Sequence, residues 1–179
     1  MTTEPTTTAL PLSPGTWELD KFHSAVGFTI RHLGISKVRG RFAEFDAQLT
    51  VGESLDDCEV SATVALASID TGNADRDAHV RAEDLLDVAR RPTMTFRSSG
   101  IRGDGADWTL DGELTIGDVT RPVSFAVDFG GVEDFHGGRH AGFDAVGEIR
   151  RSEFELGFSR GVLGDVVKIQ LDIQFIEPA

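Results

Sequence analysis

The C-terminal stretch of the chain alternates strictly between apolar and polar residues, and this pattern constrains the fold more than any other feature. Between Val167 and Phe175, the odd-numbered positions are apolar and the even-numbered positions are polar. Side chains of a β-strand point alternately to its two faces, so a period of two predicts a strand with one buried and one solvated face. A chain built from such strands encloses a large apolar interior.

The same alternation recurs in seven earlier segments. They are residues 25–31, 45–51, 60–66, 93–96, 108–116, 123–129 and 141–149. Glycine-rich segments lie between some of them, and we expect a turn at residues 34–40 and a flexible loop at residues 130–140. Short strands joined by hairpin turns predict an all-β fold of about eight antiparallel strands, either an up-and-down barrel or a two-sheet sandwich.

A helical period replaces the strand period after Gly72. The apolar residues that follow this spacing are Ala78, Ala82, Leu85, Leu86 and Ala89. Pro92 then disfavours any continuation of the helix. We therefore expect one inserted α-helix, about residues 74–90, with a narrow apolar stripe that lies across one end of the sheet structure.

The length of 179 residues fits one domain with a sizeable core. Residues 1–14 are rich in threonine and proline and are expected to form a disordered tail, which leaves residues 15–179 as a single β-barrel domain. No stretch of about 18 apolar residues is present for an integral membrane segment. The N-terminus has neither a basic start nor an apolar core typical of a signal peptide, so we expect a cytoplasmic protein.

The formal net charge of −13 limits the partners of the chain. Such a surface repels phosphate backbones and anionic headgroups, which argues against nucleic-acid binding and against electrostatic membrane binding. The sequence leaves the oligomeric state open, with a homodimer as one alternative.

The sequence contains no pattern that is typical of a catalytic or metal site. The five histidines are scattered without metal-ligand spacing, and the acidic neighbours of the single cysteine, Cys58, oppose thiolate formation. A Gly-x-Ser-x-Gly elbow and a phosphate-binding glycine motif are both absent from the sequence. We therefore expect neither a cofactor nor a metal, and no catalytic residue.

A series of short motifs resembles the YceI-like protein family from about Trp17 to Glu177. In chain order they are Trp17-Glu18-Leu19-Asp20, His23-Ser24-Ala25-Val26-Gly27-Phe28, His32, Gly40-Arg41-Phe42, Asp70-Thr71, Arg76-Asp77-Ala78-His79, Leu85-Leu86-Asp87, Pro92, Phe96, Gly112-Glu113-Leu114-Thr115-Ile116, Val119-Thr120-Arg121-Pro122-Val123, Ile149-Arg150-Arg151 and Phe154. Each motif is short, but their order and spacing together are specific. The sequence departs from the family pattern at Asp118 and Glu155, where glycine is usual.

The resemblance implies an extended lipocalin-like antiparallel barrel that holds a long isoprenoid chain. Together with the many apolar strand faces, it suggests a non-catalytic carrier of an isoprenoid lipid, such as a polyprenyl phosphate or an isoprenoid quinone. The residues expected to contact the lipid are Phe28, Ile30, His32, Leu66, Leu86, Phe96, Leu114, Phe125, Phe143, Ile169 and Leu171. A polar headgroup at the mouth of the barrel would meet Arg76, His79 and Arg151.

Two other functions are compatible with the same barrel. A barrel enzyme, such as an isomerase or cyclase acting on a small apolar substrate, would carry a polar residue pair with shifted pKa values deep in its interior. A ligand-free stress or structural protein would instead have a solidly packed core. The width of the interior therefore separates the carrier from the packed scaffold.

Overall fold

Eight antiparallel strands close into a barrel in the computed structural model, which describes residues 12–159 and 161–178. Closure depends on β1 (Gly15–Leu19) and β11 (Leu163–Ile176), which pair at Glu18 with Ile176 and at Leu19 with Phe175. The strands between them, in ring order, are β4 (Phe45–Val51), β5 (Glu59–Ala65), β7 (Thr93–Asp104), β8 (Asp107–Ile116), β9 (Val119–Phe135) and β10 (Gly138–Arg150). The predicted antiparallel barrel is confirmed.

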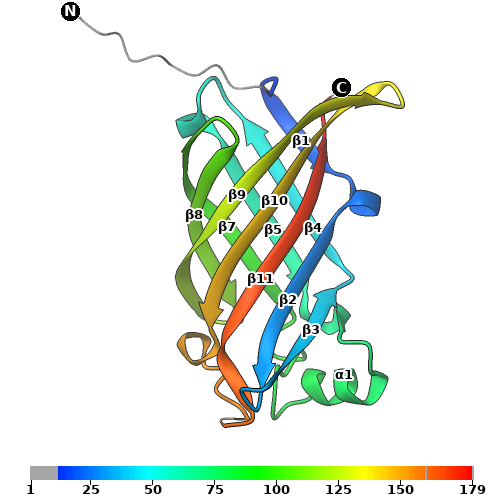
Figure 1. Ribbon diagram of the computed structural model, residues 1–179, viewed down its shortest axis with the longest axis vertical. Coiled ribbons are helices and arrows are strands. Elements are labelled where there is room, and N and C mark those ends of the chain that lie inside the picture. Colours follow the sequence, from blue (N-terminus) through cyan, green and yellow to red (C-terminus); the bar gives the residue numbers. More distant parts are fainter. Residues whose placement is uncertain (1–11, 160, 179) are drawn as a thin grey trace, which may run out of the picture.

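A three-stranded extension branches from β11 at one end of the barrel. It consists of β2 (Ala25–His32), β3 (Ser36–Phe42) and β6 (Ile69–Asp70), and the single α-helix, α1 (Ala74–Arg81), lies beside it (Figure 1). Short 3-10 helices join other strands at Lys21–His23, Leu55–Asp57, Leu66–Ser68 and Arg151–Phe154. No helix of the described residues is long and apolar enough to span a bilayer.

The inserted helix is shorter than the predicted 74–90, because α1 ends at Arg81. After that residue the N–H of Leu86 donates to the carbonyl of Val80 at 2.9 Å, and Asp87 has a left-handed backbone with φ of 50°. The chain thereby leaves the helix axis and packs Leu86 and Val88 against the barrel core. Burial of these two side chains outweighs the helical propensity of the segment.

Two glycine-rich segments that we expected to be irregular form strands instead. Most of residues 34–40 belongs to β3, in which Gly40 lies beneath the ring of Phe28. Residues 130–140 continue β9 and β10 as a paired arm, with Gly131 in a left-handed conformation. The arm extends beyond the barrel wall (Figure 1), so its side chains need not alternate between apolar and polar.

One end of the barrel is plugged by a tight cluster of apolar side chains, which we call the upper plug. Its buried members are Leu12, Trp17, Leu49, Val51, Cys58, Ile101, Ala141 and Phe175. Residues 12–14 belong to the expected tail, yet Leu12 is buried and the Ser13 hydroxyl donates to Glu177 at 2.7 Å. Residues 1–11 lie outside the described part of the chain.

Four aspartates stand directly opposite one another on the outer face of adjacent strands. This acidic ladder runs across β8, β9, β10 and β11 through Asp107, Asp128, Asp144 and Asp172. A hydrogen bond with Asp172 raises the pKa of Asp144, and burial and the charge of Asp172 act in the same direction. Like charges directly opposite each other destabilise a sheet, so the ladder opposes folding at neutral pH.

We predict that Asp144→Asn stabilises the protein at pH 7. The raised pKa of Asp144 means that its ionised form is disfavoured in the folded state, so a destabilising contribution grows as the pH rises through that pKa. Removing one of two facing charges should increase the free energy of unfolding by about 0.2–1 kcal/mol. Urea titrations at pH 7 and at a pH below the usual range of aspartate would show the gain only at pH 7. An equal gain at both values would contradict this account.

A second prediction concerns glycines that lie beneath interior rings. A Cβ at Gly112 would approach the Phe96 ring to 2.4 Å and the carbonyl of Arg97 to 2.5 Å. Gly112→Ala should therefore lower the free energy of unfolding by about 1–3 kcal/mol through overpacking. The matched control is Gly142→Ala on β10, where a Cβ meets no atom within 4 Å. Similar urea midpoints for the two variants would refute the packing argument.

Candidate ligand cavity

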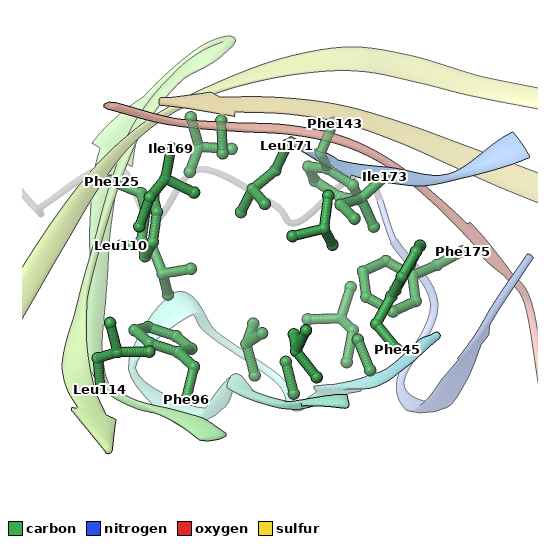
Figure 2. Close-up of a pocket in the computed structure, with 18 of the residues that line it drawn as sticks. Phe45, Phe96, Leu110, Leu114, Phe125, Phe143, Ile169, Leu171, Ile173 and Phe175 are labelled. Atoms are coloured by element: carbon green, nitrogen blue, oxygen red, sulfur yellow. The ribbon is translucent and has the colours of Figure 1, made fainter. Parts of the chain in front are cut away.

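The middle of the barrel is hollow. Apolar side chains from all sides of the ring converge on an open space, here called the upper cavity, with a volume of about 160 Å³ (Figure 2). Its lining residues are apolar except for Asp46, which is exposed and lies between two inward-facing residues of β4, Phe45 and Ala47. The directly paired Ala47 and Ala62 present only methyl groups, which leaves this space unfilled.

A second space, the lower cavity, lies toward α1 and has a volume of about 260 Å³. The two cavities share Val26, Met94 and Ile169 in their walls, so they adjoin along the barrel. The upper cavity is bounded toward the chain termini by residues that pack against the upper plug, such as Trp108 and Phe143. The interior is therefore an apolar channel that ends at the upper plug.

The eleven residues predicted to contact the ligand all lie along these two cavities. The upper cavity is lined by Phe96, Leu114, Phe125, Phe143, Ile169 and Leu171. The lower cavity is lined by Phe28, Ile30, His32, Leu66 and Leu86, and Ile169 belongs to both. Contact of these side chains with a ligand stays a prediction.

The three residues expected to meet a headgroup separate into two groups. Arg76 and Arg151 line the lower cavity, whereas His79 is not among its lining residues and instead faces Asp84 at 3.3 Å. The Arg76 guanidinium donates to the hydroxyl and to the carbonyl oxygen of Thr71, at 2.7 and 2.6 Å. Thr71 therefore fixes this cation at the wall of the lower cavity.

Arg151 is buried and holds the segment before β11 in place. Its guanidinium donates to the carbonyl oxygens of Leu156 and Phe158 at 2.8 Å, of Gly164 at 3.0 Å and of Leu163 at 3.2 Å. Burial lowers the pKa of Arg151, and the nearby charge of Asp165 opposes this shift. The guanidinium serves mainly to order the segment that carries Leu156, Phe158 and Leu163, which form part of the cavity wall.

The sequence prediction missed most of each lining. Leu110, Ile173 and Phe175 follow the same alternation as residues that were chosen, so that signal was sufficient to find them. Val38 was missed because residues 34–40 are expected to form a turn, and Phe42 lies just beyond that segment, outside any alternating run. Phe158 and Leu163 precede the alternating run that begins at Val167, and only the fold brings them to the cavity.

Polar lining side chains concentrate in the lower cavity. They are His32, Thr71, Arg76 and Arg151.

Burial raises the pKa of the Cys58 thiol, and Asp57 adds to that shift, which keeps the sulfur in its weakly nucleophilic form. Among the described residues, no three His, Cys, Asp or Glu side chains are grouped so as to hold a metal ion.

A closed antiparallel barrel with an apolar channel defines a lipocalin-like barrel protein. The chain belongs to the YceI-like domain family, whose model matches residues 17–175. It is 34% identical over 157 residues to protein YceI of Escherichia coli O17:K52:H18, an alignment that covers 87% of this chain and 82% of the relative. Protein YceI of Salmonella arizonae is 33% identical over the same length and coverage.

Solved structures share the same architecture. BcnA of Burkholderia cenocepacia superposes with a TM-score of 0.75 at 25% identity, covering 87% of this chain and 98% of that chain. The YceI protein of Campylobacter jejuni gives 0.72 at 28% identity, with coverages of 90% and 97%. A polyisoprenoid binding domain from Saccharophagus degradans gives 0.68 at 14% identity over 90% of this chain and 98% of that chain, which shows the fold alone.

We predict that Arg151→Met destabilises the protein strongly. Loss of the guanidinium leaves several buried or half-buried carbonyl oxygens without a donor, and the free energy of unfolding should fall by about 2–4 kcal/mol. The matched control is Arg150→Met, because the Arg150 side chain is exposed and should contribute less than about 0.5 kcal/mol. Guanidinium chloride titrations compare the two, and near-equal midpoints would contradict the ordering role of Arg151.

Proposed function

We propose that this protein is a non-catalytic carrier of a long isoprenoid lipid. The observation that supports it best is the apolar channel, which the barrel encloses but its own side chains do not fill. The YceI-like family, and the described ligand class of the Saccharophagus degradans domain that shares its fold, point to the same kind of guest. A polyprenyl phosphate and an isoprenoid quinone both have the required methyl-branched tail.

Burial of the tail supplies enough free energy for stable binding without a strong polar anchor. Each CH₂ removed from water contributes roughly 0.8 kcal/mol, so an isoprene unit of about five carbons gives roughly 4 kcal/mol before entropic costs. Selectivity would follow from the width and length of the channel rather than from hydrogen bonds.

The distribution of polar groups favours one orientation of the lipid. The upper cavity is lined by apolar side chains, whereas the lower cavity carries the cations of Arg76 and Arg151 and the imidazole of His32. A tail that points toward the upper plug leaves a phosphate or quinone headgroup near these donors. The apolar upper lining also favours binding over catalysis, because acid–base chemistry requires titratable groups at the reacting atoms.

The proposal is tested by the lipid that copurifies with the protein. Protein purified without detergent is extracted with organic solvent, and mass spectrometry of the extract should show a lipid whose mass series is spaced by isoprene units. A lipid-free extract, from protein that also fails to take up added polyprenyl phosphate or quinone, would overturn the proposal.

A substitution that fills the channel makes the test specific. Ala62→Phe places a ring in the upper cavity and displaces about two methylenes of ligand, which should lower lipid recovery roughly tenfold. The matched control is Thr63→Phe, whose side chain is exposed on the opposite face of β5. The lipid-free Ala62→Phe protein should melt at or above the wild-type temperature, since the ring fills empty space. Equal lipid recovery by both variants would contradict binding in the upper cavity.

A further inference from the structure

The hairpin between β2 and β3 exposes large aliphatic side chains at its tip. Leu33 is 54% exposed and Ile35 is 81% exposed, and both lie in the connecting turn. The N–H of Leu33 donates to the carbonyl of Val162 at 2.6 Å, so Val162, itself 44% exposed, lies against the turn. These three residues form what we call the apolar tip.

The turn is unfavourable by its own conformation as well as by its exposure. Leu33 has φ of 54° and is followed by Gly34 with φ of 70°. A left-handed backbone favours glycine, asparagine or aspartate, and an exposed leucine gains nothing there from packing. Strain of this kind at a solvent-exposed aliphatic residue indicates a contact that the isolated protein does not make.

Basic side chains lie beside the apolar tip on one face of the hairpin. Arg31, Lys37 and Arg39 are exposed on the outer face of the hairpin, and Arg31 stands directly opposite Lys37. Among the described residues, none of the three has a carboxylate within 4.0 Å. We call these residues the basic collar. The like charges of Arg31 and Lys37, directly opposite each other, destabilise the isolated hairpin. The left-handed backbone of the exposed Leu33 destabilises it as well.

The charge of the hairpin is opposite to that of the whole chain. No aspartate or glutamate occurs between Asp20 and Glu44, although the net charge of the protein is −13. Nine positions of β11 separate Leu163, beside the apolar tip, from Asp172 of the acidic ladder, which corresponds to about 30 Å along a strand. That distance is about three screening lengths at 0.1 M salt, so the ladder hardly affects a surface that touches the hairpin.

The apolar tip also adjoins the lower cavity. His32 and Leu163, the chain neighbours of Leu33 and Val162, line that cavity and are paired in the register of β2 and β11. In Figure 1 the hairpin lies at the end of the barrel opposite the C-terminal end of β11. This end is the one at which a lipid would enter a channel closed by the upper plug.

We propose that the β2–β3 hairpin docks the protein on an anionic lipid bilayer, with the apolar tip inserted among the acyl chains and the basic collar on the headgroups. Exposed aliphatic side chains with lysine and arginine beside them match the two layers of such an interface. Overall acidity argues against electrostatic membrane binding, but the hairpin itself carries basic and no acidic side chains. Asp165 on the neighbouring β11 accepts hydrogen bonds from the N–H and the hydroxyl of Ser152. Binding of the hairpin to a bilayer does not itself require the carrier function. Its purpose rests on that proposed function, because docking would let an isoprenoid pass between bilayer and channel without exposure to water.

The test is cosedimentation of the full chain with vesicles made of equal parts phosphatidylcholine and phosphatidylglycerol. The wild-type protein should sediment with these vesicles, less so as salt is raised, and should stay in the supernatant with phosphatidylcholine alone. Each basic residue at an anionic surface strengthens binding roughly fivefold, so the double variant Lys37→Glu/Arg39→Glu should lower the partition coefficient at least about twentyfold. Leu33→Asn should lower it about tenfold.

Both variants are chosen because they should fold at least as well as the wild type. Asparagine suits the left-handed turn, and Lys37→Glu removes the repulsion from Arg31, so melting temperatures should be unchanged or higher. Phe22→Asp is the matched control, since Phe22 is 97% exposed but lies outside the hairpin, and it should leave vesicle binding unchanged. Loss of binding together with retained stability is the expected result.

Three outcomes would overturn the docking proposal. They are wild-type protein that ignores the anionic vesicles, hairpin variants that bind as the wild type does, and a wild-type dimer that Leu33→Asn dissociates without any vesicle binding. Organic extracts of the same preparations keep this test separate from the carrier function. Lipid in the extract without vesicle binding rejects the docking alone, whereas vesicle binding with an empty channel rejects the carrier alone.

Discussion

Closure of the sheet between β1 and β11 is the constraint on which the rest of the molecule depends. Only two residue pairs join these strands, yet they convert an open sheet into a ring and direct every second side chain to a common interior. A ring of eight strands has an interior that large side chains can fill. Here the small alanines at positions 47 and 62 leave part of it empty, and glycines beneath the aromatic rings let those rings lie close to the wall. The channel therefore results from strand number and residue size together.

Much of this arrangement could be predicted from the alternation of apolar and polar residues. The period of two located every strand of the ring except β1, because each of them has one face in an apolar interior and the other in water. The five residues of β1 are too few to show the pattern. The same signal failed for β3, a strand of the extension whose apolar positions are reduced to Val38 and Phe42, with Gly40 between them beneath Phe28. The helical period failed beyond Arg81, where Leu86 and Val88 gain more from burial than from a continued helix.

Residue roles were harder to predict than strand positions. Arg151 was expected to meet a headgroup, and it does line the lower cavity, but its donors are directed to four carbonyl oxygens of the neighbouring segment. A sequence shows that a cation is present without showing what surrounds it. Glu155 gives the opposite lesson, because it replaces the glycine usual in the family and still adopts that residue's left-handed backbone, with φ of 61°. The local fold there is set by its surroundings rather than by its own side chain.

The upper plug has a further consequence for what the barrel can select. A tube that is sealed at one end acts as a ruler, since its depth fixes how many repeating units of a flexible chain fit inside. A guest that is too short leaves a void and loses contact energy, whereas one that is too long must leave its surplus protruding at the rim. Binding of short guests therefore weakens gradually with each missing unit. Long guests still fill the channel, but their surplus units are exposed at the rim. Replacing Trp17 or Phe175 of the upper plug with a smaller residue would deepen the channel and favour a longer guest, without changing the width of the channel.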